Sequence, residues 1–69
     1  MKTYQTKKGL SATEAADPMI IELARRWAVE DWAHSTPGRV VYGPDVFIEA
    51  KPNPNGFTHE LVVSGIVEA

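Results

Sequence analysis

Apolar residues recur with a helical period over residues 17–33, a segment that carries both tryptophans. Asp17-Pro18 marks its start, because aspartate is a strong N-cap and proline tolerates the first helical position. The Ser-Thr-Pro-Gly stretch at 35–38 cannot continue a helix, and its Pro-Gly suits a turn. The pattern therefore predicts a main helix over residues 18–34.

A second helix start lies just upstream. Ser11-Ala12-Thr13-Glu14 has the form of a capping box, in which Ser11 accepts from the Glu14 backbone and the Glu14 side chain returns to Ser11. Proline disfavours helical backbone in the residue before it. We expect a short helical turn at 12–16 and a break at Asp17; a single kinked helix over 12–34 is the alternative.

The main helix is amphipathic on a helical wheel. Its apolar side chains span an arc of about 180° in the angular order Leu23, Trp27, Ile20, Ala24, Ala28, Ile21 and Trp32. Glu22, Arg26 and Glu30 lie opposite. Glu22 precedes Arg26 by four residues, the favourable orientation for a helical ion pair. The apolar arc is expected to pack on a sheet.

Short segments with strand character flank the helix. A first strand is predicted at Met1–Thr6, followed by a loop at Lys7–Gly9. After the helix we predict strands at 39–42, 46–51 and 57–67, with a turn or bulge at 43–45 and an Asn-Gly hairpin loop at 52–56. Phe57, His59, Leu61 and Val63 would share one face of the last strand, and a bulge at Gly65 would change the facing of Ile66 and Val67.

The predicted order is β-α-β-β, an α+β fold. One amphipathic helix would cover a small, mostly antiparallel sheet of three or four strands, in a single domain over residues 1–69. Such a small core rarely supplies more than about 3–5 kcal/mol. Tight helix packing, oligomerisation or a bound partner would therefore have to add stability.

Composition narrows the functional classes. The chain has no cysteine and two histidines, so we expect no disulfide, no structural metal site and no cofactor. Its net charge of −2 disfavours nucleic-acid binding. No apolar run has the roughly 18 residues that span a bilayer, and the start lacks the apolar core of a signal peptide. We expect a soluble cytoplasmic protein without membrane contact.

Two groups of residues resemble catalytic motifs, but their expected geometry argues against a catalytic site. Pro44-Asp45 with Glu49-Ala50-Lys51 resembles the PD-(D/E)xK nuclease signature. On one strand, however, Asp45 and Glu49 would lie about 13 Å apart, too far to share one metal ion. Asp31, His34 and Ser35 invite comparison with a triad, but they sit together at one helix end with no oxyanion hole implied. We expect Asp31 to pair with His34 or Arg39, and His59 to be half-buried. The sequence predicts no enzyme and no small-molecule substrate.

Residues 10–16, with Arg25-Arg26-Trp27 downstream, resemble the excisionase-type helix-turn-helix. The resemblance implies a DNA-associated regulator that uses the 11–33 region. Lys7, Lys8, Arg25 and Arg26 would then contact phosphates. Asp17-Pro18 replaces the family's glycine turn, so this stays the alternative function.

One further stripe runs beside the core face of the helix. Ile21, Arg25, Val29 and Trp32 follow at i, i+4, i+8 and i+11. Tryptophan and arginine are enriched at binding hot spots, so we interpret these four residues as a partner-binding surface. The alternative is that Trp32 folds over the sheet and Val29 is an isolated exposed apolar residue.

These observations favour a small non-enzymatic protein-binding module. It is similar in size, acidity, lack of cysteine and element order to small inhibitors and regulators of phages and mobile elements, anti-CRISPR proteins among them. That resemblance implies a stoichiometric inhibitor whose partner is another protein. Self-association as a homodimer or structural homo-oligomer subunit, such as a virion component, is a further alternative.

Overall fold

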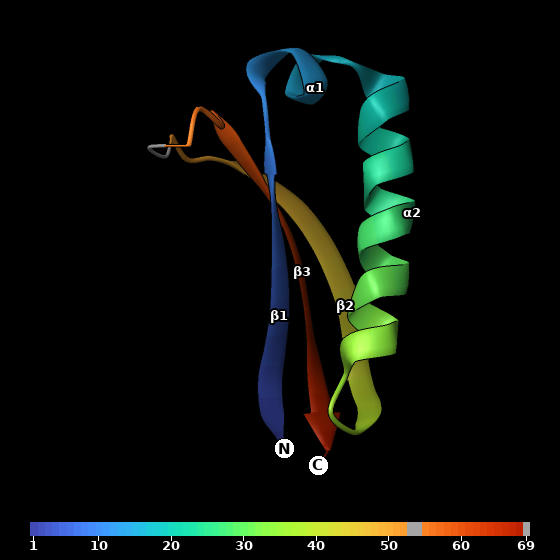
Figure 1. Ribbon diagram of the computed structural model, residues 1–69. Coiled ribbons are helices and arrows are strands. Elements are labelled where there is room, and N and C mark those ends of the chain that lie inside the picture. Colours follow the sequence, from blue (N-terminus) through green and yellow to red (C-terminus); the bar gives the residue numbers. More distant parts are fainter. Residues whose placement is uncertain (53–54, 69) are drawn as a thin grey trace.

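A three-stranded antiparallel sheet and two helices form the computed structural model, which describes residues 1–52 and 55–68 (Figure 1). The elements follow the chain in the order β1 Lys2–Leu10, α1 Ala12–Ala16, α2 Pro18–Ser35, β2 Arg39–Ala50 and β3 His59–Glu68. This confirms the predicted α+β layout with one main helix.

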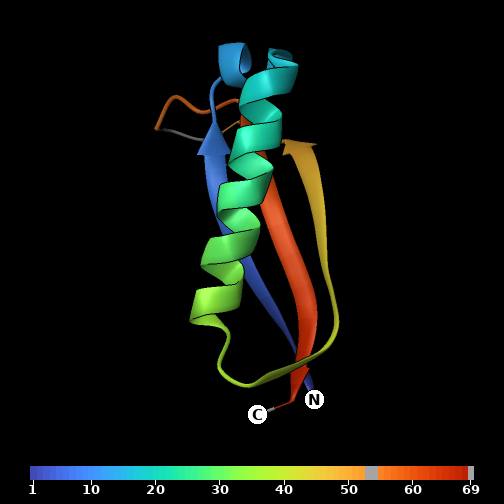
Figure 2. The same cartoon turned by 90° about the vertical axis from the view of Figure 1, so that its right-hand side faces the viewer.

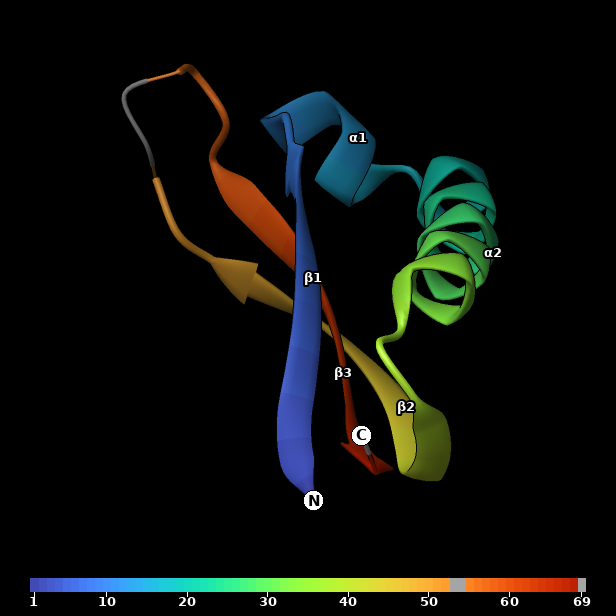
Figure 3. The same cartoon turned by 60° about the horizontal axis from the view of Figure 1, so that its bottom comes forward.

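The strands lie in the order β1-β3-β2, so the last strand of the chain occupies the middle of the sheet. Both of its neighbours pair with it antiparallel. Helix α2 runs along one face of this sheet (Figure 2). Seen from its lower end, the sheet is strongly twisted and α2 stands to one side of it (Figure 3). No described element covers the opposite face, which we call the open face.

Both predicted helix starts are confirmed. The Glu14 backbone N–H donates to Ser11 Oγ at 3.1 Å, and the Ser11 N–H donates to Glu14 Oε1 at 2.9 Å. Asp17 ends α1 with an extended backbone and caps α2, where its Oδ1 accepts from the N–H groups of Met19 and Ile20. Because Pro18 occupies the first helical turn, the chain breaks here instead of forming one kinked helix.

The first strand is longer than its sequence indicates. Lys7–Gly9, expected as a loop, continues β1 and pairs with Val62, Leu61 and Glu60. Gly9 has low strand propensity by itself, but its missing side chain leaves room for the ring of Phe57, whose Cδ2 would lie 2.5 Å from an added Cβ. Tertiary contact therefore overrides local propensity in β1. Phe57 precedes β3 and packs over Gly9, which pairs with Glu60 on the open face, so the prediction that Phe57 shares a face with Leu61 and Val63 is wrong.

The irregularity of the sheet lies in β2 and not at Gly65. Pairing between β1 and β3 runs unbroken from Lys2↔Val67 to Leu10↔His59, so the expected bulge in β3 is wrong. Register shifts fall instead between Val40 and Asp45 of β2, next to a cis Gly43–Pro44 peptide, where a turn or bulge was predicted. Strand β2 is otherwise continuous. Of the predicted hairpin loop, positions 53 and 54 lie outside the described residues.

The core lies between α2 and the sheet. It is formed by Leu10, Ala28, Trp32, Leu61, Val63 and Val67. Val46 and Ile48 of β2 extend it from the side. Within the described residues, no helix combines the length and apolar character needed to cross a bilayer.

Candidate protein-binding surface

Trp32 is the largest side chain of the core. Its exposed fraction is 1%, and its indole Nε1–H donates to the carbonyl oxygen of Tyr4 at 2.9 Å. The rings of Tyr4 and Trp32 lie 6.0 Å apart between centroids. Gly65 gives the indole its space, because an added Cβ there would lie 2.6 Å from Trp32 Cζ2. Trp32 therefore joins α2 to both β1 and β3.

This burial contradicts the placement of Trp32 on an exposed partner-binding stripe. The side chain folds over the sheet because Gly65 has no side chain and the Tyr4 carbonyl oxygen satisfies the indole N–H, which would otherwise be costly to bury. Trp32 is a structural residue.

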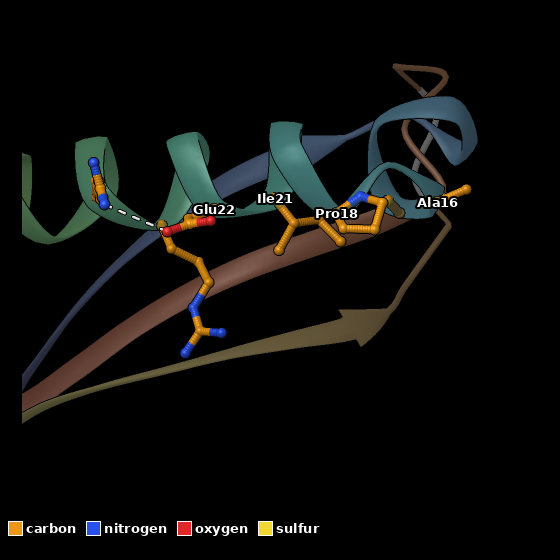
Figure 4. Close-up of a pocket in the computed structure, with 7 residues that line it drawn as sticks. Ala16, Pro18, Ile21 and Glu22 are labelled. Atoms are coloured by element: carbon orange, nitrogen blue, oxygen red, sulfur yellow. Dashed lines mark hydrogen bonds and ion pairs between the residues drawn. The ribbon is translucent and has the colours of Figure 1, made fainter.

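The other three members of the stripe lie along the β2 side of α2. Ile21 and Val29 are half-buried, and Arg25 is exposed. Two shallow grooves meet at Arg25. One of about 610 Å³ is lined by Ile21 together with residues of α1 and the start of α2; Ala16, Pro18 and Ile21 follow one another along it (Figure 4). The second, about 400 Å³, extends past Val29 to Val46 of β2. Ile21, Arg25 and Val29 thus stay together on one accessible surface, and their role in binding stays a prediction.

A second exposed surface was not foreseen. Met19, Leu23 and Trp27 follow at i, i+4 and i+8 on the outer side of α2, with exposed fractions between 55% and 74%. We call these three residues the outer stripe. Lys8 of β1 places its Nζ 4.3 Å from the centroid of the Trp27 ring, so a cation–π contact holds the indole on the surface.

The predicted core arc of α2 was too wide. It placed Leu23 and Trp27 in the core, whereas the buried residues of α2 are Ala28 and Trp32. A helix on a three-stranded sheet can bury only the residues directly above the strands, and here that line runs through the small side chains of Ala24 and Ala28. Asp31 is a charged residue inside the predicted apolar arc, and it could have indicated that fewer residues of the arc are buried.

The four basic residues considered for nucleic-acid contact do not converge. Lys7 and Lys8 project to opposite faces of β1, because neighbouring strand residues alternate. Lys7 Nζ lies 3.7 Å from Glu60 on the open face, and Lys8 covers Trp27 on the helix side. Arg26 pairs with Glu22 at 3.4 Å, as predicted for this helical pair. Three of the four cations are therefore engaged by neighbours of the same chain.

The residues that invited a catalytic interpretation have structural contacts. Ser35 Oγ accepts from the Tyr4 hydroxyl at 2.9 Å and donates to the Trp32 carbonyl at 3.3 Å. Arg39, an expected partner of Asp31, binds Glu68 at 2.8 Å instead. His59 is half-buried, as expected, with its Nδ1 2.8 Å from Thr58 Oγ1. Among the described residues, no group of three or more potential ligands converges on a metal position.

Comparison with known proteins identifies no relative of this chain. No protein-family model, curated protein or solved structure matches the chain. Functional inference therefore rests on the surfaces of α2 and the sheet.

Proposed function

We propose that this chain is a non-enzymatic protein-binding module that acts by occupying the surface of another protein through helix α2. The observation that carries the proposal is the outer stripe. Met19, Leu23 and Trp27 expose most of their apolar surface on three successive turns of a helix. Exposed apolar surface of this extent, rimmed by charged residues, is typical of an interface.

Trp27 is the expected anchor. Aromatic side chains dominate interface energetics because they bury a large area at a small cost in conformational entropy. The Lys8 contact holds the indole in place before a partner arrives, which lowers the ordering cost of binding. Charges flank the stripe on one side through the Glu22–Arg26 pair, giving the polar rim that such interfaces have.

Ile21, Arg25 and Val29 form the second part of the proposed surface, on the β2 side of α2. The two grooves that meet at Arg25 offer an apolar floor beside an exposed guanidinium group. A partner that covers the outer stripe and extends over Arg26 would reach these grooves. A stoichiometric inhibitor or regulator is the kind of protein that needs such a surface and no catalytic residues.

The test is affinity capture from a bacterial lysate with the parent chain and two matched variants of α2. Leu23→Lys places a charge in the outer stripe, whereas Ala33→Lys places the same charge on an exposed position outside it. We expect the parent and Ala33→Lys to retain a specific partner and Leu23→Lys to lose it. Circular dichroism of all three proteins checks that the fold is kept.

Arg25→Glu and Val29→Lys then test the second part of the surface. If it contributes, both weaken capture of the same partner without changing the fold. A partner that all α2 variants retain would mean that α2 is not the binding surface.

A further inference from the structure

The open face of the sheet carries a second apolar surface, separate from α2. On strand β3, Leu61, Val63 and Val67 point into the core, so the alternating residues point to the open face: Val62 and Ile66, with the polar Glu60, Ser64 and Glu68 between and beyond them. An antiparallel sheet with one wet face normally alternates apolar and polar residues. Val62 and Ile66 depart from that alternation; Val62 is already buried within the single chain at 2% exposure, whereas Ile66 is 37% exposed.

Neighbouring strands widen this apolar surface into a band. On β2, Phe47 is paired with Val62 and Tyr42 with Ile66, which places both aromatic rings on the open face. The exposed fractions of Tyr42, Phe47 and Ile66 lie between 37% and 61%. Phe57, packed over Gly9, continues the band toward β1.

Most charged residues of this face lie toward its two ends, whereas Asp45 lies at the middle of β2, level with Ser64. At one end Glu60 lies 3.7 Å from Lys7 and 3.8 Å from Lys51. At the other end Arg39 and Glu68 form an ion pair at 2.8 Å. Glu49 is level with Glu60, and Arg39 is level with Glu68, so β2 carries an acid at one end and a base at the other.

We infer that the open face binds a second copy of this chain in a two-fold symmetric dimer, with the two sheets packed face to face and their strands antiparallel. The two-fold axis lies between the two sheets, perpendicular to the strands and level with Ser64. It places residue 60 over residue 68 of the second copy, and residue 62 over residue 66. Phe47, level with Val62, then packs on Tyr42 of the second copy, and the exposed Ile66 packs beside them, over the buried Val62. Glu49 meets Arg39 of the second copy, twice by symmetry.

The pairing of Glu49 with Arg39 supports a second copy as the occupant, and the area of the open face indicates how strongly it would bind. Glu60 and Glu68 also superpose across the axis, but each has a cation within its own chain. Three strands of about ten residues give a face of roughly 33 × 14 Å. Two such faces bury about 900 Å² before side-chain relief is counted, which is below the roughly 1,200–2,000 Å² of stable specific interfaces and in the range of weak ones. A dimer that dissociates on dilution is therefore expected.

One pair in this arrangement is unfavourable. Asp45 is level with Ser64, so the axis brings it near Asp45 of the second copy at the exposed outer edge of β2. Like charges placed opposite each other across paired sheets weaken association. Asp45→Asn is thus expected to tighten the dimer.

Sedimentation velocity over a concentration series tests the inference on the full chain. We expect the parent to form a dimer and Ile66→Lys to remain monomeric, while Leu23→Lys on α2 dimerises like the parent. Glu49→Arg and Arg39→Glu should each weaken dimerisation by about tenfold, and the double variant should recover it. Circular dichroism confirms the fold of each variant.

Two results would overturn the inference: a parent chain that stays monomeric at the highest concentration, or a dimer that Leu23→Lys disrupts and Ile66→Lys does not. A dimer that Ile66→Lys disrupts, but whose charge variants show no recovery and whose Asp45→Asn form is not tighter, would overturn the register. Because Leu23→Lys separates the two surfaces, failure of the dimer leaves the proposed binding function of α2 unaffected.

Discussion

At the scale of single residues, the contact between Trp32 and Gly65 decides how α2 lies on the sheet. The indole occupies the space above Gly65, and its N–H is satisfied by a carbonyl of β1. One residue thus binds α2 to two strands. The sequence shows a tryptophan on a helix and a glycine in a strand, but nothing local indicates that the two meet, which is why the sequence left Trp32 open between the core and the partner-binding stripe.

Gly65→Ala is expected to destabilise the protein by about 1–3 kcal/mol, because the added methyl group overpacks a filled site. The methyl carbon would lie 2.6 Å from Trp32 Cζ2 and 2.8 Å from the Tyr42 carbonyl oxygen. Urea unfolding followed by tryptophan fluorescence measures the change.

Trp32→Phe supplies the control for that prediction. Phenylalanine lacks the outer indole atoms that the new methyl group would meet, so Gly65→Ala should cost less in the Trp32→Phe background than in the parent. Equal costs in both backgrounds would show that the indole is not what excludes a side chain at Gly65.

Glu14 is the residue whose titration the fold changes. Hydrogen bonds from the Ser11 backbone and side chain, with Lys8 nearby, hold the pKa of the Glu14 carboxyl below its ordinary value of 4.5. A depressed pKa means that the carboxylate stabilises the fold above pH 4.5 and that this contribution is lost as pH falls below it.

A carboxyl titration followed by NMR tests this assignment. We expect Ser11→Ala to raise the pKa of Glu14 toward its ordinary value, because the substitution removes the hydroxyl contribution and leaves the backbone N–H as the hydrogen-bond donor from residue 11. Ser35→Ala, at the far end of α2, should leave the Glu14 titration unchanged. An unaltered Glu14 pKa in Ser11→Ala would contradict the capping-box explanation.

At the scale of elements, helix starts were predictable and strand extents were not. Ser11, Asp17 and Pro18 act on backbone groups within three residues of themselves, so their effect is visible in the sequence. The extension of β1 through Gly9 depends instead on pairing with Glu60 and on the ring of Phe57, about fifty residues away. Such partners cannot be read from the segment itself.

The same difference between local and long-range contacts explains which parts of the candidate binding surface were predicted. Ile21, Arg25 and Val29 do share a surface, because helical spacing fixes which side chains are neighbours. Which side of α2 meets the sheet depends on the line of contact with β3, and this line runs through Ala28 and Trp32. Leu23 and Trp27 of the outer stripe were therefore assigned to the core.

Two aspartates at opposite ends of α2 test the role of its N-terminus. Asp17→Ala is expected to lower stability by about 1 kcal/mol, because two backbone N–H groups lose their acceptor. Asp31→Ala removes an exposed acid from the last turns, where the helix dipole disfavours it, and should be neutral or slightly stabilising. Thermal unfolding of both variants provides the comparison, and equal effects would argue against the cap.

At the scale of the whole molecule, α2 covers one face of the sheet, and no described element covers the other. The sequence predicted this single-sided layout but not the strand order, because the apolar residues of β3 fit either an edge or a central position. Its apolar residues on both sides become interpretable only once its place in the middle is known.

Concentration dependence of the melting temperature is the expected signature of paired sheets. Association of folded chains stabilises them by mass action, so the melting temperature of the parent should rise with protein concentration. Ile66→Lys should melt at a temperature independent of concentration. A hundredfold range of protein concentration corresponds to about 3 kcal/mol in association free energy. A parent whose melting temperature stays constant over that range would contradict pairing of the sheets.

The β1-β3-β2 order also sets when the protein can fold during its synthesis. Both outer strands hydrogen-bond to β3 and to no other strand described, and β3 leaves the ribosome after them. Until then α2 can form its own turns, but Trp32 lacks the strand on which it packs, and β1 has no neighbour. The sheet therefore cannot form until β3 has emerged, and nascent chains stalled before β3 should be degraded as readily as unfolded polypeptide.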